Sequence, residues 1–221
     1  MIDGHHVGSK ALAERGPGPG HSMGRRERRA ADTRLRLFRC AIQLFAERGF
    51  ANVTVGEITE AADVGKGTFF NYFETKDHVL GVMAEIQLAK IREVAGHAAE
   101  NKQAIHSLLH RMAVGLVKEP GRSPALARAV ISSFLASDVV RSLIEDRMCE
   151  GRKVIADLVK EGQKRGEIDR RLKKDAVAVQ FQQAVMGTIL LWSLHAEPPL
   201  ATWIENSFQH FWRAIAIADR D

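Results

Sequence analysis

Four polar side chains within a span of seven residues could together bind a nucleic acid. Lys66 carries a charge that pairs with phosphate, and Thr68, Asn71 and Tyr72 carry tips that form hydrogen bonds. Groups of this kind contact phosphate oxygens and the edges of bases in a groove. Gly67 has no side chain, so the start of this segment can approach a ligand closely with its backbone N–H groups. The residue types therefore predict a surface for a polyanion.

Two short helices joined by a tight turn are expected to position these side chains. The first covers about 55–62 and begins with a capping box formed by Thr54 and Glu57. A turn over 63–65 leads to the second helix, over about 66–72. This order is the helix-turn-helix arrangement, in which the second helix enters the major groove of DNA.

Apolar residues around the turn are spaced to pack the two short helices together. Ile58, Ala61, Val64 and Phe69 are expected to face inward, and Ala61 is small where the helices would approach each other. A preceding helix over about 32–49 repeats its apolar residues every three or four positions, which places them on one face. Three helices packed in this way would present the second short helix outward.

The run from Gly65 to Phe73, followed by Lys76 and Asp77, resembles the recognition-helix signature of the TetR family of transcriptional regulators. The residues that fit the preceding part of that family's pattern are Ala41, Leu44, Phe45, Gly49, Thr54, Val55, Ile58 and Ala61. The resemblance is strong over about 33–80. Beyond that segment only the number and length of the helices match.

The resemblance implies an all-α fold of about nine helices. An N-terminal three-helix helix-turn-helix domain would bind DNA, and a C-terminal helical domain would bind a ligand and form the dimer. Thr54 and Tyr72 would bond phosphate, and Lys76 would meet the DNA backbone. The residues implied to contact DNA are Thr54, Lys66, Gly67, Thr68, Phe70, Asn71, Tyr72 and Lys76.

Three positions depart from the family's pattern. Asp63 stands where the family usually has Gly, and Asp adopts the left-handed conformation less readily. Gly65 stands where a Ser cap is common, and Gly is an acceptable cap. Phe70 stands where Tyr is frequent, so a hydroxyl contact is lost there.

The chain divides into three expected parts. Residues 1–22 are rich in Gly and Pro and read as a disordered extension, with Met23 interpreted as the natural start. Residues 23–76 are the expected DNA-binding domain, and 77–221 the helical regulatory and dimerisation domain. Later helices are expected at about 76–99, 101–118 with Asn101 as its cap, 124–136, 138–165, 173–195 and 200–218.

The last two expected helices are apolar most of the way round, which requires burial on more than one side. One side can face the chain's own core and the other a second subunit. In the resembled family these helices form a four-helix dimer interface, and the residues assigned to it are Phe181, Val185, Ile189, Trp192, Phe208 and Trp212. The residues assigned to an apolar ligand pocket are Met83, Leu109, Met112, Ile131, Phe134 and Met186, each of which could equally be plain core.

Composition excludes several other classes. The formal charge is +5, and residues 1–36 hold eight basic and four acidic residues; the arginines at 25, 26, 28 and 29 are interpreted as a mobile basic tail. The longest apolar stretch, 184–192, is shorter than the roughly twenty residues of a membrane span, so no membrane partner is expected. Two cysteines fit no metal pattern, and His106 and His110 lack a third ligand. No metal, no cofactor and no enzymatic motif is expected, and the location is expected to be cytoplasmic.

The expected function is that of a DNA-binding regulator, most often a repressor in the resembled family. A homodimer would place two recognition helices in successive major grooves of double-stranded DNA about 34 Å apart, on a palindromic operator. A small apolar effector in the C-terminal domain would release it. Two alternatives stay open: an architectural protein that binds DNA without sequence preference, and a helical ligand-binding protein whose head has lost DNA binding.

Overall fold

The computed structural model describes residues 24–101, 103–136 and 138–217, and helices account for most of that part. The α-helices are α1 (Arg25–Arg48), α2 (Val55–Ala61), α3 (Lys66–Phe70), α4 (His78–Asn101), α5 (Ile105–Val117), α6 (Pro124–Ala136), α7 (Asp138–Arg165), α8 (Lys174–His195) and α9 (Leu200–Ile215). Two short 3-10 helices, Phe50–Asn52 and Pro120–Arg122, lie between them. The predicted all-α class and helix-turn-helix head are confirmed. The predicted extension over 1–22 and the start at Met23 lie outside the described residues.

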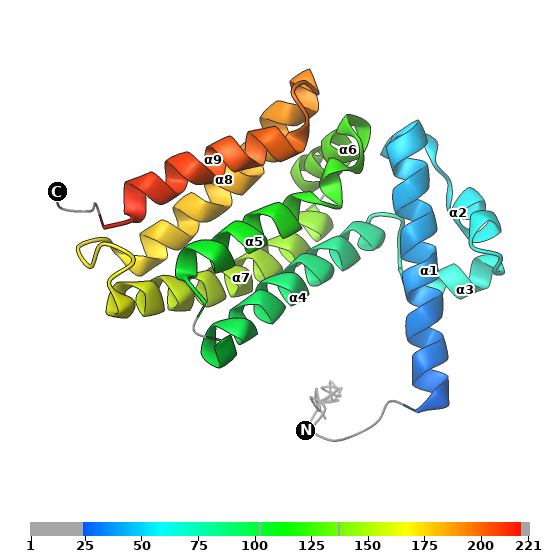
Figure 1. Cartoon of the computed structure of the whole chain (residues 1–221). Coiled ribbons are helices and arrows are strands. Elements are labelled where there is room, and N and C mark those ends of the chain that lie inside the picture. The colour runs from blue at the N-terminus through cyan, green and yellow to red at the C-terminus, as the bar shows by residue number, and fades with distance from the viewer. Residues whose placement is uncertain (1–23, 102, 137, 218–221) are drawn as a thin grey trace, which may run out of the picture.

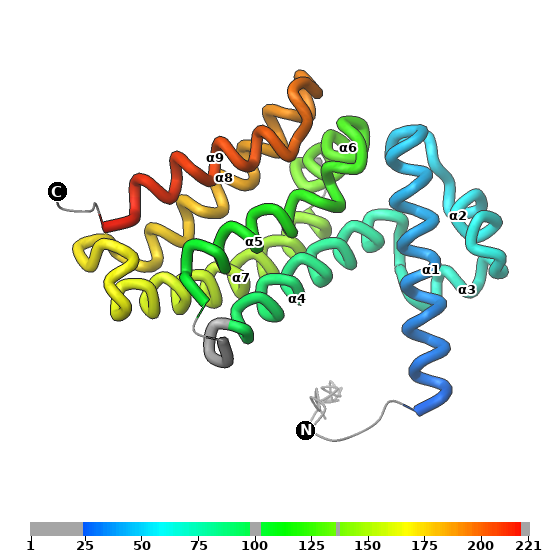
Figure 2. The backbone as a smooth tube through the Cα atoms, in the orientation of Figure 1, coloured from blue at the N-terminus to red at the C-terminus, as the bar shows by residue number. Residues whose placement is uncertain are grey.

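The helices form a head and a body (Figure 1). Helices α1 to α3 make the head, with α2 and α3 lying against one side of the long, upright α1. Helices α4 to α9 make the body, and α4 runs from the head along one side of it (Figure 2). The head is joined to α4 by the turns over 71–77, and α1 also packs directly against α6 and α4.

Helix α1 begins seven residues earlier than the apolar pattern predicted. The carboxylate of Glu27 accepts a hydrogen bond from the backbone N–H of Gly24 at 2.9 Å, which caps the first turn. The interpretation of the four arginines as a mobile tail is wrong, because residues 25, 26, 28 and 29 are exposed turns of this helix. Apolar periodicity could not detect these turns, since they bury almost nothing.

The capping box of α2 is confirmed in both directions. The Thr54 hydroxyl accepts from the Glu57 N–H at 3.2 Å, and the Glu57 carboxylate accepts from the Thr54 N–H at 2.7 Å. The turn after α2 places Asp63 at φ +49°, the left-handed conformation expected where the family has Gly. The small residue buried between the helices is Ala62, while Ala61 is exposed, so the sequence assignment was one residue out of register.

One apolar cluster joins the head to the start of the body. Phe45, Ile58 and Phe69 are fully buried in the head, and Leu80 of α4 and Leu126 of α6 belong to the same cluster. The predicted domain boundary at residue 76 remains an interpretation of the sequence, since the packing continues across it. A shift of α4 must therefore be felt in the head, because close-packed groups move together.

Helix ends in the body differ from the expected ones in one informative place. Asn101 is the last residue of α4 rather than the cap of the next helix, and α5 begins at Ile105. The cap before α6 is as expected, because Ser123 Oγ accepts a hydrogen bond from the Leu126 N–H at 3.1 Å. Helix α8 as a whole is long and apolar enough to cross a membrane, but nearly half of its apolar window is buried within the molecule. It reads as a core helix with one face uncovered.

Candidate functional site

The outer face of α3 is held in place by a single buried ring. Phe69 is fully buried, and its ring packs against Phe73 at 5.2 Å and edge-on to Phe70 at 5.5 Å between centroids. With Phe69 fixed inward, Lys66 and Asn71 on the same segment are exposed. Asn71 and Tyr72 lie in the turn after α3, because the helix ends at Phe70 rather than at 72.

Phe70 is the large apolar side chain that this face exposes. It is 51% exposed, beside the exposed Lys66 and Gly67, with Thr68 half-buried. An exposed ring gains nothing from water, but it can contact the methyl group of thymine in a major groove. Phe70 thus presents an exposed apolar surface at the position where the resembled family often has a hydroxyl.

Thr54 and Glu57 place a carboxylate close to the expected DNA face. Hydrogen bonds from the Thr54 backbone and hydroxyl, together with the charge of Arg48, hold the pKa of Glu57 below its usual value. The Arg48 guanidinium lies 3.0 Å from that carboxylate. The pair offsets the negative charge, which would otherwise repel phosphate.

Lys76 is engaged inside the head. Its Nζ donates to the carbonyl oxygens of Phe50 at 2.7 Å and Val53 at 2.8 Å, and it lies 4.3 Å from the centre of the Phe50 ring. Two of its three donors are thus used to hold the 3-10 turn after α1. The contact with DNA expected for Lys76 stays a prediction. Tyr72 is half-buried and its ring packs against the core of the head.

An ion pair joins the head directly to α4. The Arg34 guanidinium of α1 donates to both carboxylate oxygens of Glu85, at 2.9 and 3.2 Å. A bidentate geometry fixes direction as well as distance. Together with the shared apolar cluster, it couples the orientation of α4 to that of α1.

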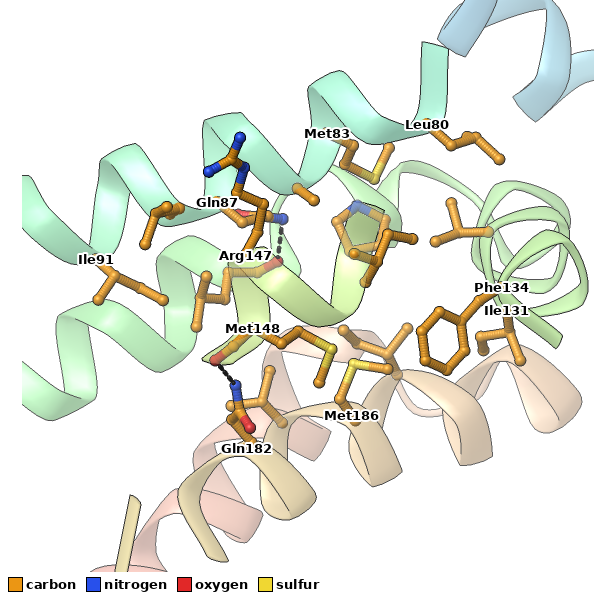
Figure 3. Close-up of a pocket in the computed structure, with 18 of the residues that line it drawn as sticks. Leu80, Met83, Gln87, Ile91, Ile131, Phe134, Arg147, Met148, Gln182 and Met186 are labelled. Carbon is orange, nitrogen blue, oxygen red and sulfur yellow. Dashed lines mark hydrogen bonds between the residues drawn. The ribbon is translucent and has the colours of Figure 1, made fainter. Parts of the chain in front are cut away.

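A cavity of about 150 Å³ lies between α4, α6, α7 and α8 (Figure 3). Four residues assigned to a pocket from the sequence line it: Met83, Ile131, Phe134 and Met186. The other two assigned residues, Leu109 and Met112, are buried in the body core and are not among the residues that line this cavity. Both lie on α5, which packs against α4 and α9 and contributes Leu116 to the cavity wall.

Sequence reasoning missed the polar residues of the cavity wall, Gln87, Arg147 and Gln182. The available signal was a glutamine inside each of two apolar helical stretches, where an unpaired amide is costly. Gln182 donates to the Met148 carbonyl oxygen at 2.9 Å, which ties α8 to α7. Gln87 donates to the Leu116 carbonyl oxygen at 2.8 Å, which ties α4 to α5.

Most residues assigned to a dimer interface are buried within their own chain. That assignment is corrected for Phe181, Val185, Ile189, Trp192 and Phe208, which are all part of the body core; Trp212 is half-buried. The apolar residues that α8 exposes are Val179, Met186, Leu190, Leu191 and Leu194. The helix is apolar on both sides, so the sequence could not show which side its own neighbours cover.

The two histidines of α5 pack against α9. His110 Nε2 lies 2.6 Å from a Glu205 carboxylate oxygen, and this contact and a hydrogen bond from Gln209 hold the pKa of Glu205 below its usual value, with Gln209 the larger cause. The His106 ring packs edge-on to Trp212 at 4.9 Å between centroids. Over the residues described, no group of three or more potential ligands is placed to hold a metal ion.

The helix-turn-helix part of the chain matches a known protein family, and longer stretches of the chain match known regulators. Residues 37–83 match the family described as bacterial regulatory proteins, tetR family. The chain is 27% identical over 150 residues to the HTH-type transcriptional repressor DhaR of Mycobacterium sp. strain GP1, covering 67% of this chain and 76% of that protein. It is 29% identical over 196 residues to the transcriptional regulator AcuR of Cereibacter sphaeroides, covering 79% and 83%.

Solved structures share the fold at low sequence identity. The regulator FadR from Bacillus subtilis, solved in complex with stearoyl-CoA, superposes with a TM-score of 0.67 at 17% identity, covering 80% of this chain and 96% of that one. These relatives and this neighbour are all named as transcriptional regulators or repressors.

Proposed function

The chain belongs to the TetR family of transcriptional regulators, and on that premise we propose that it is a homodimeric repressor released from a palindromic operator by a small molecule. It is a DNA-binding regulator by family. The observation that carries the finer proposal is the path from the cavity to the head: α4 lines the cavity with Met83 and Gln87 and joins the head through Leu80 and Glu85. The proposed location is the cytoplasm, where the operator is.

The proposed DNA contacts are made by the outer face of α3 and its flanks. Lys66 supplies charge to phosphate, Asn71 and Thr68 supply hydrogen bonds, and Phe70 supplies an apolar contact in the groove. Gly67 lets the backbone approach, and Thr54, Tyr72 and the remaining donor of Lys76 meet phosphates at the edges. What supports this set is the exposure of Lys66, Phe70 and Asn71 around a buried Phe69.

The proposed dimer uses the uncovered face of α8 with α9 beside it. Leu190 is 43% exposed and Leu194 is 62% exposed, on the same side of the helix as Val179 and Met186. A contiguous apolar strip on a soluble protein is a common mark of an interface. We expect a second copy of the chain to cover this strip, because a two-fold axis brings the same strip of both copies together. The two heads would then stand on one side of the dimer, as a palindrome requires.

The proposed release acts through the position of α4. A ligand shifts the equilibrium only if it binds one spacing of the two heads better than the other. The cavity wall includes α4, so filling the cavity favours the α4 position that fits the ligand. The stearoyl-CoA complex of the Bacillus subtilis neighbour supports a ligand in this fold.

Selection of bound sequences from random double-stranded DNA tests the proposal. We expect an inverted repeat whose half-sites are separated by about one helical turn. Enrichment of no motif despite salt-sensitive binding would favour the architectural alternative, and no binding at all would favour a ligand-binding protein without DNA function. A matched control is Asn71→Ala, which should lose the motif while its thermal unfolding stays unchanged, since Asn71 is exposed.

A further inference from the structure

One polar atom in the wall of the cavity has no partner. Gln87 lines the cavity, and its Oε1 is buried without a hydrogen bond among the described residues. A buried acceptor without a donor is costly, and native structures rarely leave one unexplained.

The orientation of this amide is fixed by its other end. Gln87 Nε2 donates to the Leu116 carbonyl oxygen at 2.8 Å. Rotating the amide by half a turn would place two oxygens against each other, so the free atom is an acceptor and not a donor. A molecule that fills the cavity therefore lies against the side chain that carries this unpaired acceptor, on α4.

The other polar groups of the described wall are already matched. Gln182 donates to the Met148 carbonyl oxygen and accepts from Arg152 at 3.3 Å. Arg147 is the one charged residue that lines the cavity in the described part of the chain, and its Nη1 donates to Glu150 at 2.8 Å. The wall thus offers an arginine that shares its partner with Arg92, a paired amide and one unpaired acceptor. Figure 3 shows Gln87, Arg147 and Gln182 in this wall.

We propose that the effector is a compact, neutral, apolar molecule with one hydrogen-bond donor, which pairs with Gln87 Oε1. This inference rests on the proposed ligand response and names its chemistry. The size follows from the cavity of about 150 Å³, because an apolar cavity of that volume accommodates roughly one aromatic ring. Neutrality follows from two groups of the wall: the unpaired acceptor disfavours an anion beside it, and Arg147 disfavours a cation, because its partner Glu150 is shared with Arg92.

The donor contact also explains how such a small ligand acts on the head. Gln87 lies on α4 two residues after Glu85, the residue that holds Arg34 of the head. A ligand that bonds Gln87 fixes α4 at the point where it is joined to α1. An apolar molecule without a donor fills the same space but leaves the acceptor unpaired.

Isothermal titration calorimetry with two matched probes tests the proposal. Thymol carries one phenolic hydroxyl, and p-cymene is the same hydrocarbon without it. A hydroxyl that finds no partner on burial weakens binding, so thymol binds more tightly only if the acceptor is met. In the full chain we expect thymol to bind roughly five- to tenfold more tightly than p-cymene, the effect of about one hydrogen bond.

Two variants locate the acceptor. Gln87→Met keeps the volume and removes the acceptor, so the ratio between the probes should fall to one or below, because the hydroxyl is then buried without a partner. Gln182→Met changes a glutamine in the same wall whose Oε1 is already paired, so the ratio should persist. The comparison of two probes on the unchanged chain stands even if a variant fails to fold.

Several outcomes would overturn the inference: equal binding of both probes, binding of neither, persistence of the ratio in Gln87→Met, or tighter binding of stearoyl-CoA than of thymol. Operator binding measured without any probe distinguishes a failure of the proposed ligand chemistry from a failure of the proposed regulator function. A chain that binds its operator but no probe refutes the ligand chemistry alone. A chain that binds thymol as expected but no DNA refutes the proposed regulator alone.

Discussion

Replacing Lys76 by Met should destabilise the head before it affects any contact with DNA. The ammonium group donates to two carbonyl oxygens, of Phe50 and Val53, and lies over the Phe50 ring. Two bonds from a charged donor at a half-buried site contribute about 3 kcal/mol, and the ring adds about 0.5 kcal/mol. The conformational entropy that the side chain regains when it is no longer held offsets about 1.5 kcal/mol of this loss. The free energy of unfolding should therefore fall by about 2 kcal/mol.

Urea unfolding followed by circular dichroism measures that loss. Lys66→Met is the matched control, because the same substitution at an exposed residue should change stability by less than about 0.5 kcal/mol. The two variants should differ in the reverse way in DNA binding: Lys66→Met should reduce the dependence of binding on salt by about one phosphate contact. Unchanged stability in Lys76→Met, with a reduced salt dependence, would refute the internal role of Lys76.

Four further predictions concern the DNA face, the dimer and acid stability. Tyr72→Phe should weaken operator binding by about 1 kcal/mol, one hydrogen bond, in a fluorescence anisotropy titration without changing thermal unfolding. Phe70→Ala should weaken binding to an operator that contains thymine, and the difference should shrink when that thymine is replaced by uracil, which lacks the methyl group. Leu190→Glu should convert the dimer to a monomer in light scattering, whereas Val114→Glu, at 44% exposure on α5, should not. The pKa of Glu57 is lowered in the fold, so its contribution to stability is present at neutral pH and is lost as the pH falls below the ordinary carboxyl value of about 4.5. Glu57→Gln should therefore flatten the dependence of the free energy of unfolding on pH in that range. An unchanged dependence would count against the capping box as its cause.

The head was predictable because its signals are local. The capping box at Thr54 and the turn at Asp63 depend on neighbours a few residues away, which the sequence displays directly. The early start of α1 was missed for the complementary reason. Its first turns are held by Glu27 and by helix propensity, with almost no burial to create an apolar pattern.

In the body, contacts between segments far apart in the sequence limited what the sequence could predict. Lys76 reaches carbonyl oxygens that lie 26 and 23 residues earlier in the chain, and Gln87 reaches one 29 residues later. No spacing rule indicates such pairs. An apolar residue such as Leu109 satisfies the same pattern whether it lines a cavity or fills a core, so its place depends on which helix packs beside it.

By itself, the sequence determined that this chain is helical, that residues 54–76 form a helix-turn-helix, and that its final helices need burial on two sides. Tertiary structure alone decided which side of α8 is covered, leaving Leu190 and Leu194 exposed and Phe181 in the core. It also decided that Gln87 lines a cavity and carries a buried acceptor without a partner. The physical reason is that helix formation and capping act over a few residues, whereas burial is fixed by the relative placement of whole helices.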